Sequence, residues 1–162
     1  MLLALDVGNS NIVIGCIENG EISHVFRMVT NINKTEYEYA VEMKSILDFE
    51  GIDTKGFDGA IISSVVPPLV NVLKTAVKKV TGKTALVVSA GIKTGMNILI
   101  DDPATLGSDL VADGVAAMTH YKLPVIVFDM GTATTISVID KDGNFIGGAL
   151  CPGVQLSMNA LA

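Results

Sequence analysis

Two stretches of the sequence follow nearly the same pattern: LLALDVGNSNIVIG at residues 2–15 and VIVFDMGTATTISV at residues 125–138. Each starts with an apolar run typical of a buried strand, continues with Asp, a spacer and Gly, and returns to an apolar strand. Three pairs of residues share one spacing of 123 positions: Asp6 and Asp129, Gly8 and Gly131, and the later turn glycines Gly20 and Gly143. This common spacing predicts two related β-meanders that each begin with Asp-x-Gly.

The first meander is predicted from strands at 2–5, 11–17 and 21–29, with the hairpin turn ENGE before the third. A helix is predicted at 35–51, because Thr35 and Glu38 form a capping box and Gly51 ends the run. The second meander is expected to begin at Pro124.

Between these elements, DGAIISSVV at 58–66 predicts a buried strand, and the two prolines after it open a helix that stops at Gly82. TALVVSA at 84–90 predicts another strand, followed by a loop at 91–104. A helix at 103–121, capped by Asp102, is expected to join the two halves.

Composition limits the functional classes. The chain has 162 residues, of which 49% are hydrophobic and 17% charged, so it can build a core. No apolar run approaches the roughly 18 residues of a membrane span, and the start lacks a basic region, so neither a membrane anchor nor a signal peptide is expected. The two cysteines, Cys16 and Cys151, favour reduced thiols and a cytoplasmic location. A net charge of −6 without a basic patch disfavours nucleic acid as the main partner.

The Asp-x-Gly turns have the chemistry of an anion site. Glycine lets backbone N–H groups approach a phosphate closely, and short polar side chains follow in both copies. An Asp at the end of a buried strand needs a partner, which a cation can supply. One copy alone is equally well explained as an ordinary turn in which Asp bonds its own backbone. Two copies in register favour a nucleotide with Mg²⁺, and the sequence has neither a P-loop nor a Rossmann motif.

At the level of whole motifs, the chain resembles the type III pantothenate kinases. DVGNSN, IISSVVPPL, KTG, DDPATLGSDLV and DMGTATT occur in the order seen in that family, across essentially all residues. The family belongs to the actin/hexokinase/Hsp70-like (ASKHA) superfamily, so the resemblance implies an α/β fold with a duplicated RNase H-like domain. Residues 1–118 would form the first copy and residues 119–162 the start of a second copy, which is truncated here.

The resemblance also implies roles on the nucleotide side. Asp6 would act through Mg²⁺, and the phosphates would be lined by Gly8, Asn9, Ser10 and Asn11. Asp129 would help to hold a monovalent cation, K⁺ or NH₄⁺. The residues facing ATP in the second motif would be Gly131, Thr132 and Thr134.

On the substrate side, GSDLV matches the family's G-A-D-R-[IV], which makes Asp109 the implied catalytic base and places Gly107 beside pantothenate. Leu110 stands where the family has an Arg that is expected to contact the acidic substrate, and Leu cannot replace its charge. Ile100 stands where a pocket Tyr is common, and Asp102 where Asn is usual. From the residues alone, Asp109 and Asp113 are better explained as two solvated carboxylates than as residues of a site.

The sequence therefore predicts ATP-dependent phosphorylation of pantothenate in coenzyme A biosynthesis, by a homodimer that uses ATP, Mg²⁺ and a monovalent cation. Two alternatives remain open because the departures from the family pattern gather on the substrate side. One is a kinase of the same fold for another small hydroxyl substrate. The other is a non-catalytic, regulatory relative.

Overall fold

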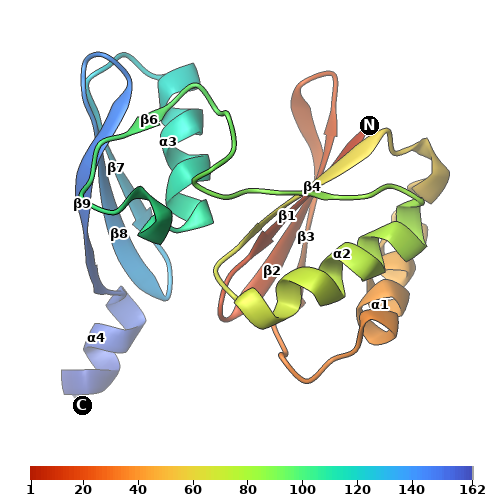
Figure 1. Ribbon diagram of the computed structural model, residues 1–162. Coiled ribbons are helices and arrows are strands. Elements are labelled where there is room, and N and C mark those ends of the chain that lie inside the picture. Colours follow the sequence, from red (N-terminus) through yellow and green to blue (C-terminus); the bar gives the residue numbers. More distant parts are fainter. Residues whose placement is uncertain (162) are drawn as a thin grey trace. The chain divides into compact units, whose positions relative to one another are not determined.

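The computed structural model describes residues 1–161 in two units, Met1–Val88 (unit 1) and Ser89–Ala162 (unit 2), and each unit has its own sheet (Figure 1). The observed class is α/β with mixed sheets, as predicted. None of the helices among these described residues is long and apolar enough to cross a membrane.

The sheet of unit 1 contains a meander and two added strands. Its antiparallel part consists of β1 (Leu2–Val7), β2 (Asn11–Glu18) and β3 (Glu21–Val29), and β4 (Gly59–Ser64) and β5 (Leu86–Val87) extend it in parallel. The strand order is β3-β2-β1-β4-β5. Asn19 and Gly20 both have positive φ, as the predicted two-residue hairpin turn requires. The predicted meander is confirmed.

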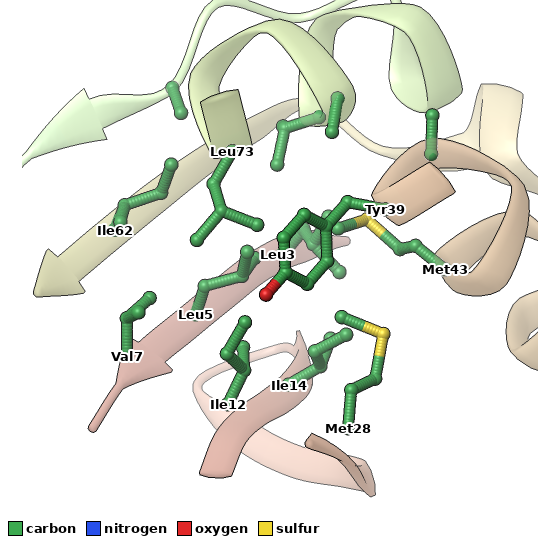
Figure 2. Packing of buried hydrophobic residues seen from close by; sticks show 14 of the residues in the cluster. Leu3, Leu5, Val7, Ile12, Ile14, Met28, Tyr39, Met43, Ile62 and Leu73 are labelled. Carbon is green, nitrogen blue, oxygen red and sulfur yellow. The ribbon is translucent and has the colours of Figure 1, made fainter. Parts of the chain in front are cut away.

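Two helices cover one face of this sheet: α1 (Glu36–Phe49) and α2 (Pro67–Thr81), with the 3₁₀ turn η1 (Thr54–Gly56) between them. Alternate residues of each strand point to them, so Leu3, Leu5 and Val7 of β1 pack beside Tyr39 and Leu73 (Figure 2). Asp6 alternates with these residues and therefore lies on the face that α1 and α2 leave bare.

The capping box at the start of α1 is confirmed. The Thr35 hydroxyl accepts from the Glu38 N–H, and Oε2 of Glu38 accepts from the Thr35 N–H at 2.8 Å. The Thr35 hydroxyl also donates to Oε2 at 2.8 Å, and the bonds that the carboxylate accepts from the Thr35 backbone first and the Thr35 side chain second lower the pKa of Glu38. The carboxylate therefore stabilises the fold above its ordinary pKa, and this contribution is lost as pH falls through the lowered value.

Thr35→Ala is expected to lower the free energy of unfolding by about 1 kcal/mol, because the first turn loses its side-chain acceptor. Urea denaturation at pH 7 measures this change. Thr35→Ser keeps the acceptor and should match the parent chain, so equal losses in both variants would exclude the cap as the cause.

Unit 2 contains the second predicted meander, formed by β7 (Val125–Met130), β8 (Ala133–Ile139) and β9 (Asn144–Pro152). The short strand β6 (Asn97–Ile98) adds in parallel, giving the order β6-β9-β8-β7. The 3₁₀ turn η2 (Pro103–Thr105), α3 (Ser108–His120) and α4 (Val154–Leu161) complete the unit.

Helix α3 covers one face of the second sheet. A Cβ added to Gly114 of α3 would lie 3.7 Å from Ile139 of β8, so α3 packs on the face that contains Ile139 and its partner Val125. Asp129 is four residues after Val125 in β7 and therefore lies on this same face. The opposite face exposes Ile126, Phe128 and Met130.

Three sequence predictions need correction. The helix expected at 103–121 is two elements, because Leu106 and Gly107 have extended backbone between η2 and α3; Asp102 caps η2, not α3. The strand expected at 84–90 is only β5, and the expected loop 91–104 contains β6.

The two units divide between Val88 and Ser89, and α3 belongs to unit 2, where it packs on β7 and β8. The domain boundary predicted at 118/119 is based on the sequence repeat and stays a prediction.

Candidate active site

The first Asp-x-Gly turn joins β1 to β2 through Gly8, Asn9 and Ser10. The Gly8 N–H donates to the carbonyl oxygen of Asn11 at 3.0 Å. A Cβ at Gly8 would lie only 3.2 Å from that same oxygen, so a side chain would force the closed turn to shift. The turn is thus narrow, and Asn9, Ser10 and Asn11 are exposed on it.

Asp6 lies two residues before Gly8 and is exposed. Its neighbours across the sheet are Val13 of β2 and the buried Ser63 of β4. Asn11 is two residues before Val13 in β2, so its side chain lies on the same face as that of Val13 and of its partner Asp6. The Asp6 carboxylate and the Asn11 amide are thus on one face, at the same end of the meander. The structure therefore brings together two oxygen-bearing side chains beside the turn.

The Asp6 carboxylate beside the glycine turn fits a Mg²⁺ ion that is also bound by phosphate groups. Among residues 1–161, no cluster of three or more His, Cys, Asp or Glu side chains could hold a metal alone. Mg²⁺ is commonly bound by one or two carboxylates, several waters and the substrate phosphates. A single exposed carboxylate beside a glycine turn supplies the protein's part of such a site.

The second turn, between β7 and β8, contains only Gly131 and Thr132. The Gly131 N–H donates to the Ala133 carbonyl at 3.0 Å. This turn is one residue shorter than the first, because Asp129 pairs with Thr135, six positions on, whereas Asp6 pairs with Val13, seven positions on.

The two meanders share a further feature. Each has a β-bulge three residues after the partner of its Asp, between Cys16 and Ile17 in one and between Val138 and Ile139 in the other. The second meander, whose Asp-x-Gly turn is one residue shorter, has one residue more at its next hairpin, where Gly143 closes a turn longer than the Asn19-Gly20 turn. The shared spacing of 123 therefore results from two length changes that cancel.

The structure separates two residues of the second motif. Asp129 and its partner Thr135 lie on the face covered by α3, whereas Thr134 pairs with Met130 on the opposite, open face. Thr132 is exposed in the turn itself. Asp129 and Thr134 thus point to different sides of the sheet.

Asp109 lies in the first turn of α3, and Gly107 is the N-cap of that helix. A Cβ at Gly107 would collide with Oδ1 of Asp109, so the carboxylate lies over the N-cap residue. A carboxylate in the first turn also interacts favourably with the helix dipole. Gly107 and the Asp109 carboxylate therefore lie close together at the start of α3.

Asp109 and Asp129 lie at the same end of unit 2. Helix α3 contacts β7 and is joined to it by residues 121–124 alone, so the two run in opposite directions (Figure 1). Both elements are about 20 Å long by their usual rise per residue, which places the start of α3 level with the end of β7. Two carboxylates on one face thus border this end of the unit.

The remaining substrate-side residues, Ile100 and Leu110, are half-buried in unit 2. Leu110 directly follows Asp109 on α3 and provides no charge. Asp113, one turn further on, lines a groove of about 450 Å³ between the second half of α3 and β7, together with His120 and Phe128. That groove lies toward the other end of the helix from Gly107.

The sequence reasoning missed one residue that contacts the first turn. Thr30, directly after β3, donates its hydroxyl to the Gly8 carbonyl at 2.7 Å and its N–H to the Ser10 carbonyl at 3.1 Å. The repeat did contain a signal, because Gly153 stands 123 positions later, directly after β9.

The chain is similar in sequence to known proteins. The type III pantothenate kinase of Brevibacillus brevis is 45% identical over 161 residues, which are 99% of this chain and 63% of the relative. The chain thus spans 63% of the length of the curated relatives it matches.

Two solved structures share the fold at lower identity. One is a Campylobacter jejuni protein assigned to the Baf family of transcriptional activators, with a TM-score of 0.53 and 20% identity over 94% of this chain and 55% of that one. The other is a Porphyromonas gingivalis protein assigned as an N-acetylglucosamine kinase, with a TM-score of 0.51 and 12% identity over 92% and 47%. These structures support the fold alone. The family model of type III pantothenate kinase matches residues 2–162, and the chain belongs to that family.

Proposed function

We propose that this protein transfers the γ-phosphoryl group of ATP to the hydroxyl of pantothenate, giving 4′-phosphopantothenate for coenzyme A biosynthesis. Family membership supports the reaction class. The observation that carries the assignment in the structure is the Asp109 carboxylate, held over Gly107 at the end of unit 2 that also contains Asp129.

Phosphoryl transfer depends mainly on positioning and on charge stabilisation. Asp109 accepts a hydrogen bond from the pantothenate hydroxyl and orients its oxygen for in-line attack. The turn formed by Gly8, Asn9, Ser10 and Asn11 lines the phosphates with backbone N–H groups and short donors. When bound, Mg²⁺ neutralises phosphate charge, and Asp6 is the residue that would hold it.

The second turn is proposed as a nucleotide and cation site of unit 2. Asp129 is exposed at the end of β7 and would hold K⁺ or NH₄⁺, with Gly131 and Thr132 beside the nucleotide. Thr134 lies on the opposite face from Asp129, so a contact with ATP there requires the nucleotide to reach that face.

Two proposals concern architecture. The β-bulge at matching positions supports descent of both meanders from one duplicated RNase H-like domain. The homodimer follows from the family resemblance.

A cytoplasmic location is supported by two unpaired cysteines. Cys16 is buried, which raises the pKa of its thiol, and Cys151 is exposed.

A second candidate, a kinase for another small hydroxyl substrate, is favoured by Leu110. An acidic substrate such as pantothenate is usually recognised by a cationic side chain, and Arg is the best suited. Leu110 leaves this part of the motif uncharged, which is compatible with a neutral acceptor.

ADP release by the natural full-length protein, with and without pantothenate, tests the proposal. We expect turnover that needs pantothenate and Mg²⁺ and is higher in K⁺ than in Na⁺. Competition by pantothenate for turnover of a neutral alcohol would separate the second candidate. Nucleotide binding without turnover of any acceptor would instead support a regulatory relative.

A further inference from the structure

The residues directly after the third strand of each meander occupy equivalent places. Thr30 follows β3 and Gly153 follows β9, again 123 positions apart. Each donates its backbone N–H to a carbonyl of the neighbouring Asp-x-Gly turn, Thr30 to Ser10 and Gly153 to Thr132, both at 3.1 Å. Each turn is therefore tied to the end of its third strand.

The side chains differ because the turns differ in length. In the longer first turn, the Thr30 hydroxyl fits and donates to the Gly8 carbonyl at 2.7 Å. In the shorter second turn, a Cβ on Gly153 would collide with the carbonyl oxygens of Gly131 and Thr132. Gly153 therefore cannot make the side-chain hydrogen bond that Thr30 makes to the carbonyl of the first turn's glycine.

This bond fixes the orientation of a peptide group. In a planar trans peptide the C=O and the following N–H point in opposite directions. With the Gly8 carbonyl held toward Thr30, the Asn9 N–H points away from Thr30. The Ser10 carbonyl is held on the same side, so neither oxygen faces an anion that approaches from the opposite side.

We propose that Thr30 is a positioning residue for nucleotide binding, which holds the Gly8–Asn9 peptide with its N–H toward the phosphates. The inference rests on the proposed function, because it assigns the anion as the phosphate tail of ATP. Thr30 acts through the turn and is not itself a contact to the nucleotide.

The test compares Thr30→Val with Thr30→Ser in the natural full-length protein. Valine keeps the shape and the backbone N–H but removes the hydroxyl, whereas serine keeps the hydroxyl. We expect Thr30→Val to raise the Kd for Mg²⁺ and a non-hydrolysable ATP analogue about tenfold, the effect of one well-placed hydrogen bond, and Thr30→Ser to stay within about twofold. Isothermal titration calorimetry measures both.

The matched control is Thr75→Val. The Thr75 hydroxyl also donates to a backbone carbonyl, that of Asn71 at 3.0 Å, but within α2. It should leave the Kd unchanged. Hydrogen exchange of the segment 8–11 adds a readout without nucleotide, and exchange should be faster in Thr30→Val than in Thr30→Ser.

Several outcomes would overturn the inference. A lower melting temperature of Thr30→Val with the Kd at the parent value would make Thr30 purely structural. Equal weakening by valine and serine would exclude the hydroxyl. A parent protein that binds no nucleotide would refute the proposed function itself, and the inference would fall with it.

Discussion

Asp109→Asn is expected to lower kcat by about 10³-fold, since it removes the carboxylate that orients the acceptor hydroxyl. Asparagine has nearly the same size, so the fold of α3 and the place of Gly107 should be kept. The Kd for the ATP analogue should stay within about twofold, because the lost group acts on the acceptor side. Steady-state kinetics and calorimetry on the natural full-length protein measure the two effects.

Asp113→Asn is the matched control, because Asp113 is also half-buried and lies one turn later on the same helix. Its kcat should stay within about threefold of the parent, as for a substitution outside the site. A similar loss in both variants would point to the charge of α3 in general. Near-normal turnover by Asp109→Asn would show that another residue is the base.

Among the predicted substitutions, Gly153→Ala should lower the free energy of unfolding most. The added Cβ would collide with two backbone carbonyl oxygens, those of Gly131 and Thr132, and backbone atoms cannot rotate away as a flexible side chain can. The turn or the end of β9 must move, at a cost of about 2 to 3 kcal/mol in the free energy of unfolding. Urea denaturation, followed by circular dichroism, measures the loss.

Gly15→Ala is the corresponding control. A Cβ at Gly15 of β2 meets nothing within 4 Å, so its stability should change by less than about 0.5 kcal/mol. If both alanine variants lost the same stability, the collision would be excluded as the cause.

The meanders were predictable because their signals are local. Strand alternation and the turn Asn19-Gly20 gave β3 its bounds at Glu21–Val29 without any distant contact. The start of α3 was placed wrongly, because Asp102-Pro103 is a strong helix-start signal that here opens only a 3₁₀ turn. Strand β6 was missed because a strand of two residues is too short to show an alternation of apolar and polar residues. Only its pairing with β9 defines it.

The candidate site divides in the same way. Asp6, Gly8 and Asp109 could be found from motifs, because each lies within a short stretch of recognisable spacing. Ser63 beside Asp6 depends on the parallel register of β1 and β4, which the sequence does not encode locally. Thr30 is separated by 22 residues from Gly8, and its one sequence signal is the spacing of 123 to Gly153, a residue of a different type.

The difference in turn length also predicts how freely each position can evolve. At position 30 the longer turn leaves room for a side chain, so a saturation library there should yield a graded series of variants, with serine close to the parent. At position 153 the two carbonyl oxygens leave no room for any Cβ, so every substitution should be depleted under selection. Natural adjustment of nucleotide affinity is therefore expected to use the first turn, while the second stays fixed.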